Sequence, residues 1–107
     1  MIIPSAMRDN EMTNRLQSNT SFTTEKASQY LQTLCKHFGH KLKTEFTADQ
    51  GLIEFPFGFC KLIADTTTLN MTGNANTSED LDRLQTVMTN HLARFAFREE
   101  PNLTWNR

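Results

Sequence analysis

The sequence lacks the features that place a chain in a membrane or on nucleic acid. No apolar run in its 107 residues approaches the roughly 20 residues needed to cross a bilayer. The formal net charge of −1 argues against nucleic-acid binding and against a polybasic membrane anchor, because both depend on an excess of clustered cations. We therefore expect neither nucleic acid nor a membrane as a partner.

The N-terminal segment also lacks the apolar stretch of roughly 7–15 residues that a secretory signal requires. Only Ile2 and Ile3 are apolar before Pro4 and a polar run. We therefore expect a cytoplasmic protein in which residues 1–12 form a flexible extension and residues 13–107 form one α+β domain.

Motifs for phosphate cradling, serine hydrolysis and zinc proteolysis are missing, since no G-x-G-x-x-G, P-loop, G-x-S-x-G or H-E-x-x-H pattern occurs. Cys35 and Cys60 are far apart and show no metal-type spacing. They are expected to be reduced, buried thiols, with a disulfide or a reactive thiol as the alternative. The sequence therefore predicts no cofactor.

What the chain does contain is strong hydrophobic periodicity. Between Thr24 and Phe38, apolar residues recur at three and four positions, which predicts a helix with one buried face. That face is formed by Ala27, Tyr30, Leu31, Leu34, Cys35 and Phe38. Thr24 is expected to cap the helix, Glu25 to lie in its first turn, and Gly39 to end it in a left-handed conformation.

The segment from Lys41 to Gly73 alternates with a period of two, which predicts four short strands in a meander. An earlier strand is expected around Thr20 and Phe22. A second helix is expected over residues 78–95, capped by Thr77 or Ser78. Its apolar face comprises Leu81, Leu84, Val87, Met88, His91, Leu92 and Phe95.

After the second helix, Leu103 and Trp105 alternate with polar residues and predict a last strand. The expected order is strand, helix, four strands, helix, strand. This order predicts a two-layer α+β sandwich, in which an antiparallel sheet carries both helices on one face.

Cations gather near the ends of both predicted helices, and they form the candidate ligand-binding site. These residues are His37, His40, Lys41, His91, Arg94 and Arg98. They compensate the partial negative charge of helix C-termini, or they form a patch that receives a carboxylate or phosphate group. The first interpretation needs no ligand, whereas the second predicts a small acidic ligand or an acidic partner protein.

A metal site built from His37, His40 and His91 is a weaker interpretation. Cys35 cannot join His37 on one ion, because residues two apart lie roughly 200° apart around a helix. His37 and His40 become neighbours only if the helix continues through Gly39. His91, on an apolar face, is either a neutral core residue with one hydrogen-bonded nitrogen or a partly buried imidazole with a lowered pKa.

The sheet face opposite the helices is the second candidate surface. If Cys60 and Leu62 point toward the helices, Phe59 and Ile63 must point away, and Phe57 is expected to join them. An open sheet face is normally polar. These three apolar residues therefore predict an interface, which is either a homodimer contact or a binding site for a partner protein. A bulge or the N-terminal segment covering them is the alternative.

Three segments resemble a bacterial family known as domain of unknown function 2218. They are TTEKASQYLQTLCKHFGHK (residues 23–41), GLIEFPFGFCKL (51–62) and HLARFAFREEPNLTW (91–105). The resemblance spans about residues 19–107, with Gly39 standing where the family usually has alanine. The recurring residues of the family correspond to Tyr30, Leu34, Cys35, His37, Phe38, His40, Lys41, Gly58, His91, Leu92, Arg94, Phe95, Phe97, Arg98 and Trp105.

The resemblance implies no established activity. It implies an iron-linked context, because related domains are joined to, or encoded near, siderophore-interacting reductases. We expect a non-enzymatic accessory domain that binds an acidic small ligand or a partner protein through the cationic residues. The alternative is a metal-dependent or acid–base enzyme that uses His37, His40 and His91.

Overall fold

The computed structural model describes residues 16–107, so the extension predicted for residues 1–12 lies outside the described residues. In chain order the elements are β1 (Leu16–Thr23), α2 (Ala27–Phe38), β2 (Lys43–Phe46), β3 (Gln50–Phe55), β4 (Gly58–Ala64), β5 (Thr68–Ala75), α3 (Ser78–Phe95) and the short 3-10 helix η1 (Phe97–Glu99).

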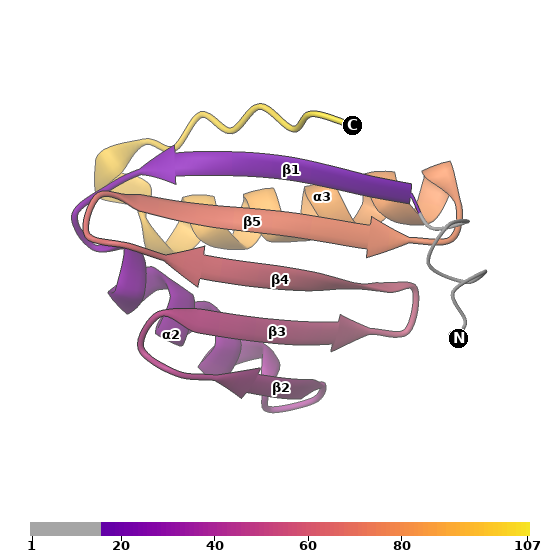
Figure 1. Ribbon diagram of the computed structural model, residues 1–107, viewed down its shortest axis with the longest axis horizontal. Helices are drawn as coiled ribbons and strands as arrows, with labels where there is room; N and C mark the ends of the chain where they lie inside the picture. The colour runs from indigo at the N-terminus through magenta and orange to yellow at the C-terminus, as the bar shows by residue number, and fades with distance from the viewer. Residues whose placement is uncertain (1–15) are drawn as a thin grey trace, which may run out of the picture.

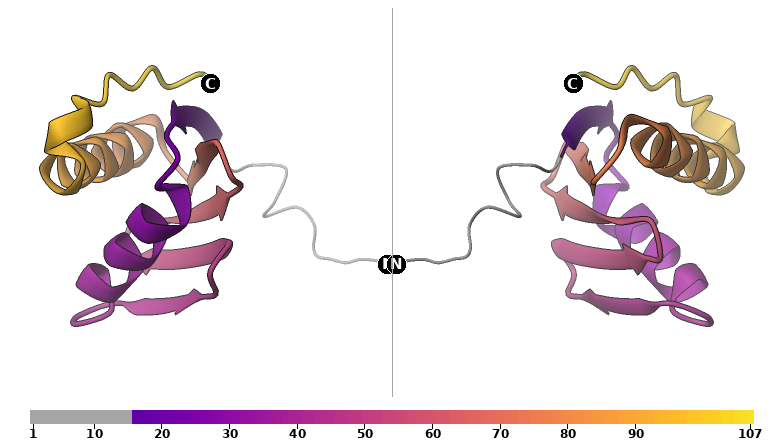
Figure 2. Two further views of the ribbon diagram at one scale, coloured as in Figure 1. Left: turned by 90° about the vertical axis from the view of Figure 1, so that its left-hand side faces the viewer. Right: turned by 90° about the vertical axis from the view of Figure 1, so that its right-hand side faces the viewer.

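The five strands form one antiparallel sheet in the order β1-β5-β4-β3-β2 (Figure 1). Strands β2 to β5 form the predicted meander, and β1 pairs with the last strand of that meander. Both helices lie on the same side of the sheet (Figure 2). The predicted two-layer α+β sandwich is confirmed.

Helix α2 buries the whole face that its periodicity predicts, from Ala27 to Phe38. Its start differs from the prediction, because a turn precedes Ala27 and the hydroxyl of Thr24 accepts a hydrogen bond from the backbone N–H of Lys26. Glu25 consequently lies outside the first helical turn.

The left-handed conformation predicted for Gly39 is wrong, since its φ of −64° and ψ of −13° are right-handed. Close packing explains the glycine instead. A Cβ atom there would lie 2.9 Å from Oγ1 of Thr44 and 3.0 Å from the carbonyl oxygen of Cys35. The chain keeps winding past Gly39, with the N–H of Lys41 donating to the carbonyl of Phe38 at 3.1 Å.

The strands present their predicted inward residues to the helices. Cys60, Leu62 and Ala64 of β4 are buried, as are Leu69 and Met71 of β5. Glycines let α3 approach this layer closely: a Cβ atom at Gly73 would lie 2.6 Å from a methyl carbon of Leu84. The core therefore fills the space between one sheet face and the two helices.

Helix α3 begins as predicted, with the hydroxyl of Thr77 accepting a hydrogen bond from the N–H of Asp80 at 3.1 Å. It buries Leu81, Leu84, Met88 and Leu92, while Val87, His91 and Phe95 are half-buried. In the described part of the chain, neither helix combines the length and the apolar character needed to cross a membrane.

The predicted last strand is reduced to one bridge, between Asn106 and Asn19 of β1. The C-terminal tail runs alongside β1 (Figure 1). Side chains hold most of it: the indole N–H of Trp105 donates to the hydroxyl of Thr89 at 2.9 Å, and Arg107 contacts Asp82.

Candidate functional site

The two helices bring His37 and His91 together where they pack against each other. His37 lies in the last turn of α2, and His91 lies one turn before the end of α3. Their ring centroids are 5.0 Å apart, with the planes tilted by 47°. Phe38 contacts His91 at 4.6 Å, and Phe95 contacts His37 edge-on at 5.5 Å. We call these four residues the histidine seam.

One hydrogen bond orients the ring of His91. Its Nδ1 lies 2.8 Å from the backbone carbonyl oxygen of Val87. Because a carbonyl oxygen can only accept, Nδ1 carries the proton and donates it. In the neutral ring, Nε2 then holds the free lone pair. The hydrogen bond is the feature expected of a core histidine, whereas the half-burial of the ring is the feature expected of the alternative, a partly buried imidazole.

The pKa of His37 lies below its ordinary value of 6.5. Desolvation is the largest cause, followed by electrostatic repulsion from His91, Arg94 and His40, which opposes protonation of the ring. His37 is exposed, as are Arg94 and His40. Arg94 and two further histidines therefore lie near an imidazole that is mainly neutral at pH 7.

The right-handed turn at Gly39 brings His40 into this group. The N–H of His40 points to the carbonyl of His37 at 3.4 Å, so the chain continues nearly as a helix for one more step. This is the condition under which His37 and His40 become neighbours. The structure thus associates four of the six predicted ligand-binding residues: His37, His40, His91 and Arg94.

The other two predicted cations are placed differently. Lys41 is exposed in the loop before β2. Arg98 lies in η1, with its guanidinium 5.3 Å from the ring centroid of Phe97. Their proposed share in a ligand site stays a prediction.

A metal centre has little support from side-chain positions. Across residues 16–107, no three His, Cys, Asp or Glu side chains are placed to hold one ion. Cys35 and Cys60 are free, buried thiols, and burial raises the pKa of Cys35 to about 11 and that of Cys60 to about 12. Both are therefore protonated at neutral pH, and neither is an activated nucleophile.

The sequence reasoning missed the pairing of Tyr30 with Glu99. The Tyr30 hydroxyl donates a short hydrogen bond to the Glu99 carboxylate, which ties η1 to the first part of α2. Burial and this carboxylate raise the pKa of Tyr30 to about 12. Hydrogen bonds from Tyr30 and Thr24 lower the pKa of Glu99. No sequence pattern links two residues 69 positions apart.

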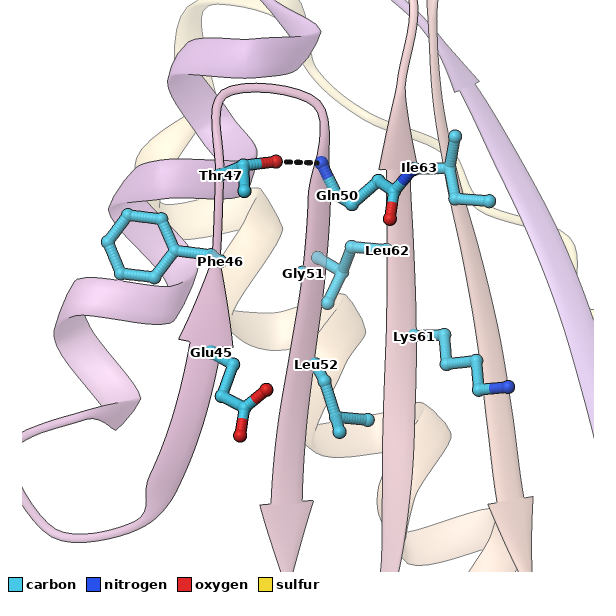
Figure 3. Close-up of a pocket in the computed structure, with 9 residues that line it drawn as sticks. All are labelled: Glu45, Phe46, Thr47, Gln50, Gly51, Leu52, Lys61, Leu62 and Ile63. Carbon is cyan, nitrogen blue, oxygen red and sulfur yellow. Dashed lines mark hydrogen bonds between the residues drawn. The ribbon is translucent and has the colours of Figure 1, made fainter.

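The candidate interface residues are divided between the two sides of the sheet. Ile63 lies on the open face, as Figure 3 shows from that side. Its side chain is 54% exposed. Phe59 shares this face through the alternation of β4 and is half-buried. Phe57 instead stacks on Phe55 at 5.1 Å and lies under the guanidinium of Arg83, on the helical side. The expectation that Phe57 joins the open face is therefore wrong.

Comparison with known proteins agrees with the resemblance seen in the sequence. The family model described as "Uncharacterized protein conserved in bacteria (DUF2218)" matches residues 19–106. The NMR structure of PA4090 from Pseudomonas aeruginosa is 34% identical, with a TM-score of 0.73, and the match covers 84% of this chain and 94% of that one. No curated protein matches the chain. The chain belongs to the bacterial family called domain of unknown function 2218.

Proposed function

We propose that this chain is a non-enzymatic binding domain whose histidine seam, together with Arg94 and His40, receives the carboxylate or phosphate group of a small acidic ligand. The observation that carries the proposal is the convergence of His37, His91, Arg94 and His40 from two elements. Dipole compensation alone explains cations at each helix end separately, but it does not require the two ends to meet.

The absence of internal counter-charges supports an external anion. Among residues 16–107, the ion pairs join Lys43 to Glu54 and Arg107 to Asp82, and neither involves the seam. Desolvation is the main cause of the lowered pKa of His37, and electrostatic repulsion from its neighbours adds to it. An anion placed among these cations would relieve that repulsion and favour the protonated imidazole. Binding is therefore expected to be accompanied by proton uptake at mildly acidic pH.

The buried ring of Phe38 and the half-buried ring of Phe95 place apolar surface next to His91 and His37. A carboxylate or phosphate on a small organic molecule matches both features, because the anion contacts Arg94 while the carbon skeleton covers the rings. The metal form of the enzyme alternative, which uses His37, His40 and His91, has less support, because no three His, Cys, Asp or Glu side chains in residues 16–107 are placed to hold one ion.

Ligand-dependent unfolding provides the test. Inorganic phosphate and citrate are titrated at pH 6 and at pH 8, with ionic strength held constant by sodium chloride. Stabilisation is expected to be larger at pH 6, and Arg94→Gln is expected to weaken the apparent affinity at least about tenfold. Lys36→Gln is the matched control, because Lys36 is an exposed cation one residue before His37 on a different side of α2.

Equal losses in Arg94→Gln and Lys36→Gln would mean nonspecific charge screening and would overturn the proposal. The iron-linked context can be examined in the same titration. Ferric citrate and citrate are compared at equal concentration, and tighter binding of the ferric complex supports that context. Identical affinities for ferric citrate and for citrate would contradict the iron-linked context without affecting the proposed anion site.

A further inference from the structure

The sheet face opposite the helices has two chemically different halves. Within residues 16–107, no helix covers this face (Figure 2). On β1 and β5, polar side chains pair across the strands. The Thr72 hydroxyl donates to the Asn19 amide oxygen at 2.8 Å, and the Gln17 amide donates to that of Asn74 at 3.2 Å. These groups satisfy one another, and among them Asn74 is buried, so its amide needs the partner that Gln17 provides.

The half formed by β2, β3 and β4 is more apolar. Leu52 and Ile63 lie on this half, on neighbouring strands (Figure 3). Ile63 is 54% exposed. Together with Glu45, Phe46 and Lys61 they border a hollow of about 550 Å³ that is open along the face. Leu52 is half-buried, whereas the exposed Ile63 is unusual on an open sheet face and indicates a surface that another molecule covers.

Charges are placed symmetrically around Leu52. In the register of the sheet, Glu45 pairs with Leu52, and Leu52 pairs with Lys61. A carboxylate, an apolar side chain and an ammonium group therefore form one row across β2, β3 and β4 (Figure 3). The two residues of opposite charge lie on the strands next to β3, and each of these strands is about 4.8 Å from it.

We propose that this half-face binds a second copy of the chain, around a two-fold axis that runs along β3. Such an axis places Leu52 on the partner's Leu52 and exchanges the two flanking strands. Glu45 then lies opposite the partner's Lys61, and Lys61 lies opposite the partner's Glu45. A two-fold interface must be self-complementary in this way, and the row meets the requirement.

The neighbouring row is compatible with the same arrangement. Glu54 lies on β3, so the axis brings it near the partner's Glu54. Each carboxylate has its own cation, because Nζ of Lys43 lies 3.8 Å from Glu54. A small ligand is less suited to the hollow, since it is open along the sheet and few polar groups converge on it. The observations therefore favour an extended, flat partner.

A charge exchange tests the proposal by analytical ultracentrifugation. Wild type is expected to dimerise at micromolar concentration. Ile63→Lys and Glu45→Lys are each expected to weaken the dimer at least about tenfold, because every substitution acts twice in a two-fold interface. The double variant Glu45→Lys/Lys61→Glu restores opposite charges across the axis and is expected to recover most of the affinity.

Arg83→Glu is the matched control, since it reverses an exposed charge on the helical side and is expected to leave dimerisation unchanged. Circular dichroism verifies that each variant is folded. A wild-type monomer throughout the concentration range would overturn the proposal. So would a dimer that Ile63→Lys leaves intact, or a double variant no stronger than Glu45→Lys alone.

Discussion

At the scale of the residue, the environment of His37 has a direct consequence for stability. Its pKa is below the ordinary value of 6.5, so the unfolded chain binds a proton at a higher pH than the folded chain does. Between these two pKa values the unfolded state carries more protons, and the free energy of unfolding rises with pH. The contribution of His37 is therefore complete above pH 6.5 and is lost as pH falls below it.

Replacing His37 is expected to remove its contribution to the pH dependence of the free energy of unfolding. We expect the free energy of unfolding of wild type to decrease between pH 7 and pH 5, and the decrease to be smaller in His37→Gln. Urea denaturation at several pH values measures the difference. Lys36→Gln serves as the control and is expected to keep the wild-type slope. A His37→Gln profile parallel to that of wild type would show that other groups cause the pH dependence.

The sequence predicts some members of the site because they belong to periodic faces. His91 lies on the apolar face of α3, so its contact with α2 follows from the packing of the two helices. The position of His40 could not be predicted, because it depends on the backbone at Gly39. Glycine adopts both hands of the backbone with similar ease, so its presence at position 39 does not predict which one occurs. The close packing against Thr44 and Cys35 explains why the residue is glycine, but it is visible only in the structure.

At the scale of the element, the N-terminus of α3 depends on one side chain. The hydroxyl of Thr77 accepts the N–H of Asp80, which otherwise has no partner within the helix. Thr77→Ala is expected to reduce the free energy of unfolding by about 1 kcal/mol. Thr86→Ala, at an exposed interior position of the same helix, is expected to be neutral or slightly stabilising. Thermal or urea denaturation compares the two, and equal effects would contradict a capping role.

The strand predicted around Leu103 and Trp105 shows a limit of alternation as evidence. The alternation is real, because the side chains of Leu103 and Trp105 pack against the core while Thr104 between them is exposed. A ladder also needs backbone partners along its whole length. Pro101 has no N–H to donate, and the observed backbone exchange joins only Asn19 and Asn106. Periodicity predicts which side chains point inward, but it does not predict whether the backbone forms hydrogen bonds with a neighbouring strand.

At the scale of the whole molecule, the C-terminal tail joins the two layers, since it contacts both β1 and α3. Trp105 is its main anchor. We expect Trp105→Ala to cost about 3 kcal/mol through lost burial, and Trp105→Phe to cost about 1 kcal/mol, mainly through the lost hydrogen bond to Thr89. Urea denaturation measures both. A negligible effect of Trp105→Ala would mean that the tail contributes nothing to holding the layers together.

The pairing of β1 with β5 also sets an order of events during synthesis. Thr23 pairs with Thr68, and Leu16 pairs with Ala75, so the first strand has its partner near the far end of the chain. The hairpins between β2 and β5 close over short loops and can form as soon as they leave the ribosome. Strand β1 cannot pair until β5 has been synthesised. In the nascent chain, the backbone edge of β1 is therefore exposed without a partner strand until translation of the sheet is complete.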